Sequence, residues 1–155
     1  QECLVDMQIQ AHIPDRYIEN LSQRLEIYRR IADIRTRDDA LDVTDELIDR
    51  FGEPPESVNG LIEVALLRNL ASGLGISEVK QRDDCLLLYK PGFSLKNSAD
   101  MAQMAALTST LKKRVTLNAS GKPYISVKIV SPMTPLDVLG ETLNLMEDAR
   151  KSVKK

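Results

Sequence analysis

The chain has 155 residues, of which 43% are hydrophobic and 28% are charged, and its formal net charge at pH 7 is −2. This length and composition are ordinary for one globular domain. The slightly acidic balance excludes the whole-domain basic field that is expected of a dedicated DNA-binding domain.

The cysteines and the histidine are too few and too far apart for a structural zinc site. They are Cys3, Cys85 and His12. Both cysteines lie in strand-like runs, so we expect reduced, half-buried thiols and a cytoplasmic protein. We expect no membrane span and no signal peptide. Because position 1 is Gln, we expect the chain to start inside a longer polypeptide.

The first half of the chain predicts one strand followed by three helices. Hydrophobic and polar residues alternate with a period of two at the start, which is typical of a half-buried strand. Apolar residues then recur at steps of three and four, which is typical of helices with one buried face. The predicted ranges are 5–13 for the strand and about 18–31, 37–51 and 54–72 for the helices.

Capping residues support the ends of these helices. Thr36 and Asp39 have the spacing of a capping box, with Asp in place of the usual Glu. Gly52 suits the left-handed residue just past a helix end. Pro54 or Pro55 fits the first turn of the next helix.

The second half of the chain predicts two pairs of strands, each followed by a helix. In the first of these helices Met101, Met104, Ala105 and Leu107 are expected to face inward, and the tail from Arg150 to Lys155 is expected to fray. The predicted strands are 76–81, 85–89, 115–119 and 124–130, and the helices are 98–110 and 136–146.

These elements predict an α+β fold. The first half is helical after an N-terminal strand, and mixed strands and helices then form a small sheet with packed helices. We treat residues 1–155 as a single domain with a soft boundary near residues 73–76.

No constellation for catalysis is found, and we predict no catalytic, cofactor-binding or metal-binding residue. A Gly-rich phosphate-binding loop and an HExxH motif are both missing. His12 occupies a polar position of the first strand, where a solvent-facing role is expected. Paired carboxylates with Mg²⁺ are the remaining route to an enzyme, and they would have to converge in a cleft rather than lie on a convex helix.

Glu46 and Asp49 are the candidate site residues, because a spacing of three puts both acids on one face of a helix. They belong to an acidic run that is either a solvated face or a docking strip for arginines of another domain. The alternative function is an accessory DNA-binding module that uses the basic clusters at 112–114 and 150–155.

The chain resembles the C-terminal domain of bacterial transcription-repair coupling factors, the Mfd proteins. The resemblance is specific over roughly residues 4–80 and extends over the second half only as a pattern of strands and helices. The matching blocks are Ile13-Pro14-Asp15-x-Tyr17-Ile18, Arg24-Leu25-x-x-Tyr28-Arg29-Arg30-Ile31-Ala32, Glu46-Leu47-Ile48-Asp49-Arg50-Phe51-Gly52 with the prolines after it, and Leu67-Arg68 with Leu74-Gly75-Ile76.

The resemblance implies a non-catalytic regulatory domain within an ATP-dependent double-stranded DNA translocase that acts in transcription-coupled nucleotide-excision repair. In the family, this domain packs against the N-terminal UvrB-like module and masks the surface that UvrA uses, until RNA polymerase is engaged. Motor domains, which contact DNA, lie elsewhere in such proteins. Glu46 and Asp49 match the family's acidic positions at the interdomain contact, where they face arginines of the partner module, and Asp45 is only a neighbour of these positions.

Overall fold

The computed structural model describes residues 2–153, and the chain divides into two compact units. One unit contains residues 9–69. The other contains the residues up to 8 together with those from 70 onward. That the chain is a single domain stays a prediction.

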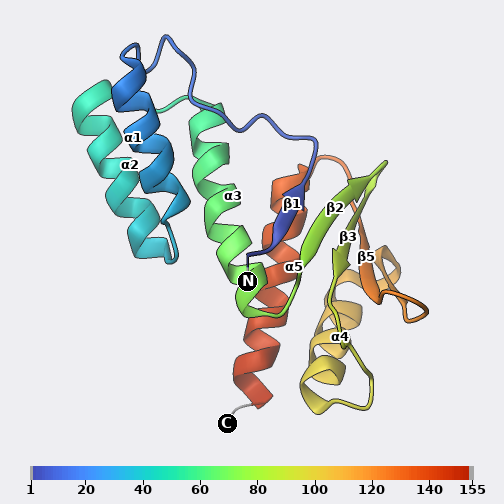
Figure 1. The fold of residues 1–155 in the computed structure, drawn as a ribbon. Helices are drawn as coiled ribbons and strands as arrows, with labels where there is room; N and C mark the ends of the chain where they lie inside the picture. The colour runs from blue at the N-terminus through green and yellow to red at the C-terminus, as the bar shows by residue number, and fades with distance from the viewer. Residues whose placement is uncertain (1, 154–155) are drawn as a thin grey trace. The chain divides into compact units, whose positions relative to one another are not determined.

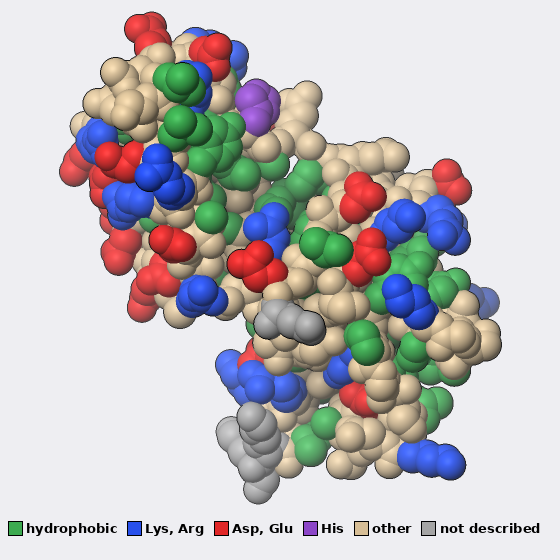
Figure 2. Space-filling view, viewed as in Figure 1, with side chains coloured by type: hydrophobic (Ala, Val, Ile, Leu, Met, Phe, Trp, Pro, Cys, Tyr) green, Lys and Arg blue, Asp and Glu red, His purple; other side chains and the backbone are tan. Residues whose placement is uncertain are grey.

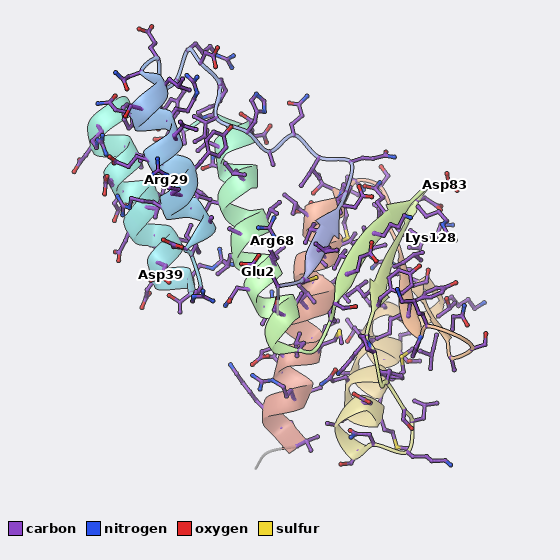
Figure 3. All side chains as sticks on the ribbon, viewed as in Figure 1. Glu2, Arg29, Asp39, Arg68, Asp83 and Lys128 are labelled. Atoms are coloured by element: carbon purple, nitrogen blue, oxygen red, sulfur yellow. The ribbon has the colours of Figure 1, made fainter. Side chains whose placement is uncertain are left out.

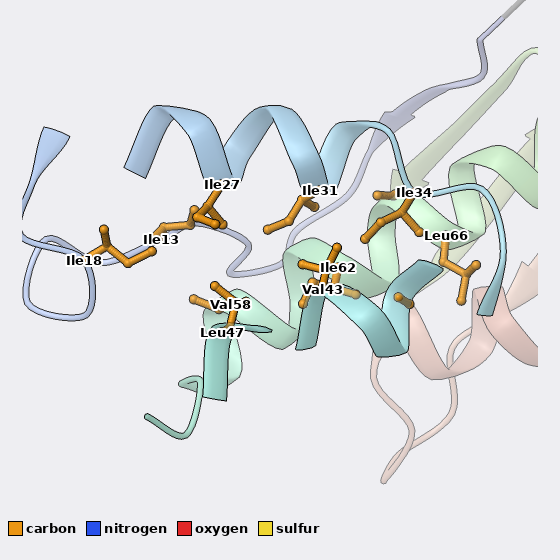
Figure 4. Close-up of a cluster of buried hydrophobic side chains, with 12 residues drawn as sticks. Ile13, Ile18, Ile27, Ile31, Ile34, Val43, Leu47, Val58, Ile62 and Leu66 are labelled. Atoms are coloured by element: carbon orange, nitrogen blue, oxygen red, sulfur yellow. The ribbon is translucent and has the colours of Figure 1, made fainter. Parts of the chain in front are cut away.

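The unit of residues 9–69 is helical (Figure 1). It contains α1 (Leu21–Ala32), α2 (Arg37–Phe51) and most of α3 (Glu56–Gly73). Its core is a cluster of aliphatic side chains from all three helices (Figure 4). Ile27, Leu47 and Val58 are completely buried, and each such side chain contributes about 1.5–3 kcal/mol to folding.

The ends of α1 and α2 follow from capping residues. The Asn20 side chain accepts from the backbone N–H of Gln23, so α1 begins at Leu21 rather than near residue 18. The capping box of Thr36 and Asp39 is confirmed, because each side chain accepts from the other residue's backbone N–H.

Glycine and proline separate α2 from α3. Gly52 ends α2 with φ 86° and ψ −171°, a backbone conformation that is almost restricted to glycine. The Pro55 carbonyl accepts from the N–H groups of Val58 and Asn59. Pro55 therefore precedes α3 instead of lying inside its first turn.

The other unit is built on a five-stranded mixed sheet with the order β1-β2-β3-β5-β4. β1 is parallel to β2, and the remaining neighbours are antiparallel. In the view of Figure 1, α5 and α4 lie behind the strands. The strands are β1 (Leu4–Asp6), β2 (Glu78–Arg82), β3 (Cys85–Tyr89), β4 (Val115–Asn118) and β5 (Tyr124–Lys128), and the helices are α4 (Ser98–Leu111), the short η1 (Lys112–Arg114) and α5 (Pro135–Val153). The α+β class is thus confirmed.

The first predicted strand is too long. Only Leu4–Asp6 pairs with β2, although exposed and less exposed side chains keep alternating up to Ile13. Beyond the sheet, the backbone finds other partners: the His12 N–H donates to the Ser57 carbonyl, and the Ile13 N–H donates to the Tyr28 hydroxyl. The alternation therefore reports which side chains face the protein and does not require a neighbouring strand.

The predicted inward face of α4 is partly wrong. Met101 is 54% exposed and Ala105 is also exposed, whereas Asp100 and Gln103 are buried. These two polar residues can lie inside because Lys90 reaches both of them, with its Nζ 2.9 Å from Asp100 Oδ1 and 3.1 Å from Gln103 Oε1. The sequence pattern of apolar residues gave no sign of this buried polar group.

The C-terminal tail was predicted to fray from Arg150, but α5 continues to Val153. Arg150 forms an ion pair with Glu147 one turn earlier, which supports the helix there. Lys154 and Lys155 lie outside the described residues.

Candidate acidic interaction surface

Four aspartates form a stripe along α2, opposite its buried residues. Their spacing of four, three and four residues places them on one face of the helix, and all four are exposed. No ion pair of these carboxylates is found within residues 2–153. We call this set the aspartate stripe; it consists of Asp38, Asp42, Asp45 and Asp49.

Two large apolar side chains border the aspartate stripe. Leu41 is 54% exposed and Ile48 is 41% exposed. They lie seven residues apart, so both fall on the same side of the helix, next to the aspartates. In the view of Figure 2, acidic side chains are seen along the left edge of this unit. An apolar patch bordered by polar groups is the layout of many protein–protein interfaces, although Asp and Glu themselves are depleted there.

Glu46 differs from the aspartates because its carboxylate is already bound. Arg30 of α1 donates to Oε1, and Arg50 of α2 donates to Oε2 at 2.8 Å. The Arg50 guanidinium also lies 3.4 Å from the Glu26 carboxylate. The Arg30 hydrogen bond, followed by that of Arg50, holds the pKa of Glu46 below its ordinary value.

Aromatic residues anchor the C-terminal end of α2. The Arg50 guanidinium lies 4.9 Å from the centre of the Phe51 ring, and that ring packs 5.9 Å from the ring of Tyr17. The Tyr17 hydroxyl donates to the Gly52 carbonyl at 2.7 Å. These contacts hold the helix that presents Asp49.

The two candidate residues from the sequence therefore lie on one helix but have different surroundings. Asp49 is exposed, whereas Glu46 is half-buried between arginines. Sequence reasoning missed the contact with Arg30, and no spacing rule could have found it, because it joins two different helices. The four-three-four spacing of the aspartates was present in the sequence, but Glu46 lies four residues after Asp42 and three before Asp49, so spacing alone could not have separated it from them.

The acids of this unit do not converge as a metal site. Within residues 2–153, no group of three or more His, Cys, Asp or Glu could hold a metal ion. A small hollow of about 220 Å³ is lined by charges of both signs, including Arg30, Asp39 and Asp42. The Asp39 carboxylate, labelled in Figure 3, already accepts from the N–H groups of Arg35 and Thr36.

Among the described residues, the basic clusters of the other unit pair with different parts of α5. Arg114 lies 3.5 Å from Glu141, near the start of α5. Arg150 pairs with Glu147 close to the other end of the same helix. Residues 141 and 150 are separated by roughly 13 Å along the helix axis, from a rise of about 1.5 Å per residue.

Among the described helices, none is long and apolar enough to cross a bilayer.

Comparison with known proteins places the chain in a family. The family model described as "TRCF domain" matches residues 7–104, which is more than half of the chain. A solved structure, described as the C-terminal domain of transcription-repair coupling factor, superposes with a TM-score of 0.84, covering 97% of this chain and 95% of that one. Its sequence is 23% identical to this chain, so the similarity shows a shared fold.

Curated relatives are similar over part or all of this chain. The transcription-repair-coupling factor of Bacillus subtilis (strain 168) is 28% identical over 99% of the chain. The protein of the same description from Staphylococcus aureus (strain USA300) is 35% identical over 52% of it. The chain spans 13% and 7% of the lengths of these two relatives, so it corresponds to a small part of each.

Proposed function

The chain belongs to the TRCF domain family, and from this membership we propose that it is the C-terminal regulatory domain of a transcription-repair coupling factor. In this proposal the domain performs no catalysis. It acts in the cytoplasm, within an ATP-dependent DNA translocase of transcription-coupled nucleotide-excision repair. It masks the UvrA-binding surface of the N-terminal UvrB-like module until RNA polymerase is engaged.

The observation that supports this proposal best is the aspartate stripe. Four carboxylates on one helix face repel one another, and each like-charged pair one turn apart costs about 0.2–0.5 kcal/mol. Arginines of another module would offset this repulsion, and Leu41 and Ile48 would supply apolar contact at its border. The stripe thus combines carboxylates without an ion pair in the described residues with exposed apolar groups at its border.

Masking needs a contact that can form and open. The aspartate stripe lies on the side of α2 away from the buried Val43 and Leu47, so releasing a partner would leave the core of this unit intact. Contacts between exposed charges are individually weak, which suits an interface that must open at modest cost. Such a contact shifts the equilibrium between the masked and the open state only if it is made in one state and not in the other.

Glu46 has a supporting role in this proposal. Its carboxylate holds Arg30 and Arg50 beside the stripe and, together with Glu26 at Arg50, offsets their charge there. Without Glu46, Arg30 would lose this ion pair and Arg50 would keep only its contact with Glu26, so more positive charge would repel the arginines of the partner. Glu46 therefore favours docking by reducing this positive charge, while Asp45 and Asp49 make the direct contacts.

A pull-down with the separately expressed N-terminal module tests the proposal. The Asp45→Arg/Asp49→Arg double variant should lose at least tenfold in binding, equivalent to about 1.4 kcal/mol. Asp148→Arg is the matched control, because Asp148 is an exposed acid on α5 outside the stripe. In the full-length protein, the double variant should bind UvrA and hydrolyse ATP without polymerase. Unchanged binding in the double variant, or equal loss in the control, would contradict the proposal.

A further inference from the structure

A groove of about 850 Å³ opens beside η1, where the ladder between β4 and β5 ends. Its lining contains four basic residues and no acidic residue, and its volume falls within the range of ligand pockets. We call it the η1 groove; it is lined by Thr110, Leu111, Lys112, Lys113, Arg114, Lys128, Ile129, Val130 and Ser131.

Two of its four cations are partly neutralised by the protein itself. The Arg114 guanidinium donates to the Lys128 carbonyl at 3.3 Å and lies 3.5 Å from the Glu141 carboxylate. Lys128, labelled in Figure 3, has its Nζ 3.8 Å from Asp84. These contacts fix one wall of the η1 groove.

The other two cations, Lys112 and Lys113, are exposed and have no ion pair within residues 2–153. Lys112 has φ 55° and ψ −126°, and a non-glycine residue at positive φ is uncommon and strained. This conformation ends α4 and begins η1, so it determines where the two lysines stand. Residues with a strained backbone of this kind cluster at active sites and ligand-binding sites.

Apolar groups accompany these charges. Leu111 is buried, Ile129 is half-buried and Val130 is 40% exposed. A phosphodiester backbone has no apolar groups to pack against these three side chains. The lining contains no aromatic ring on which a nucleic-acid base could stack. The combination of lysines with exposed aliphatic side chains instead suits a ligand that has carboxylates and apolar groups together.

We propose that the η1 groove binds a short acidic peptide segment with interspersed apolar side chains, supplied by a partner protein. The carboxylates of the peptide contact Lys112 and Lys113, and its apolar side chains cover Val130 and Ile129. The groove lies in the unit of the sheet and uses none of the residues of the aspartate stripe. This proposal therefore stands independently of the function proposed above.

Selection from a displayed library of random short peptides against this chain tests the proposal. The enriched peptides should contain acidic residues beside apolar ones. A synthetic enriched peptide should bind about tenfold more weakly to Lys113→Glu, and its binding should weaken further as salt is added. Val130→Ser should also weaken binding, by a smaller factor that salt does not change. Lys151→Glu, on the exposed side of α5, is the control and should bind like the unchanged chain.

Three outcomes would overturn the proposal. The first is a selection that yields no acidic enrichment. The second is an enriched peptide that binds Lys113→Glu as well as the unchanged chain. The third is a DNA oligonucleotide of equal charge that displaces the peptide at the same concentration, which would show that the groove recognises negative charge alone.

Discussion

Glu46 and Asp49 lie three residues apart on α2, yet only the Glu46 carboxylate is bound by arginines, while that of Asp49 faces solvent. Arg30 reaches Glu46 from α1, and Arg50 reaches it from the following turn. The same helix thus uses one acid to join two helices and leaves the next one available to a partner. Stability and docking should therefore respond to different substitutions.

Removing the charge of either acid separates these two roles. Glu46→Gln should lower the free energy of unfolding by about 1 kcal/mol, because it weakens two charge-assisted hydrogen bonds at a half-exposed site. Asp49→Asn should change it by less than about 0.5 kcal/mol. Urea denaturation of the chain measures both values. A larger loss for Asp49→Asn than for Glu46→Gln would show that the two acids have been assigned the wrong way round.

The contribution of Glu46 should disappear in acid. The Arg30 and Arg50 hydrogen bonds lower its pKa in the folded state from the ordinary value of 4.5. A lowered pKa means that the folded state favours the ionised form, so the stabilisation is complete above pH 4.5 and is lost as the pH falls through the lower value. The difference in unfolding free energy between the unchanged chain and Glu46→Gln should therefore be constant near neutral pH and shrink below about pH 4.5. A difference that persists unchanged at low pH would show that the charge of Glu46 is not its cause.

Relieving repulsion within the aspartate stripe should stabilise the chain. Asp45 lies three residues after Asp42 and four before Asp49, so Asp45→Asn removes two unfavourable contacts on the helix surface. We expect a gain of about 0.4–1.0 kcal/mol in unfolding free energy at low ionic strength, and a smaller gain in high salt.

The same Asp45→Asn substitution should weaken binding to the N-terminal module that we propose as the partner, so stability and docking would move in opposite directions. Asp148→Asn is the control for both measurements, because Asp148 lies on α5 outside the stripe. If Asp45→Asn raised stability and left docking intact, the stripe would be a solvated face.

The sequence predicts best what neighbouring residues decide. The helix predicted over residues 37–51 and the capping box of Thr36 and Asp39 depend on residues within a few positions of each other, and the structure has both as expected. The contact between Arg30 and Glu46 depends on how α1 packs against α2, so no local pattern reveals it. For the same reason, the alternation through Ile13 could not show where pairing with β2 stops.

Buried polar groups were the least predictable feature. The apolar pattern of the sequence predicts that Asp100 lies on the outside of α4. Lys90, at the end of β3, instead provides a partner for its charge. Because that partner comes from another element, the burial of Asp100 could be recognised only after the strand and the helix had been placed together.

The pair of Lys90 and Asp100 should be important for stability. Their side chains are only 13% and 10% exposed, and Asp100 Oδ2 also accepts from the Ser94 N–H at 3.0 Å. Removing one partner leaves the other charge nearly buried and unpaired, which costs roughly 3 kcal/mol. Asp100→Asn should therefore shift the denaturation midpoint strongly.

A double-mutant cycle with Lys90→Met and Asp100→Leu tests this pair. The double variant should be more stable than the sum of the two single losses predicts, because neither charge is then left alone. Additive losses would show that the two side chains do not interact.

Gly52 should tolerate no side chain, although the space around it is open. A Cβ atom added there would meet no heavy atom within 4 Å, but φ is 86° and ψ is −171°. This region is almost restricted to glycine, and other residues occupy it at a cost of about 1–3 kcal/mol. Gly52→Ala should therefore destabilise the chain by about that amount through backbone strain alone.

Gly73→Ala is the matched control, because a Cβ atom at this residue, the last of α3, would also meet open space and its φ is not in the positive range. It should be neutral or stabilise the chain by up to about 1 kcal/mol, since alanine favours helix more than glycine does. Gly52→Ala should in addition disturb the carbonyl that accepts from Tyr17, and so the end of α2 that presents Asp49. Hydrogen exchange of the last turn of α2 should be faster in Gly52→Ala and unchanged in Gly73→Ala. Equal stability of the two variants would mean that the positive φ at Gly52 is not needed to end the helix.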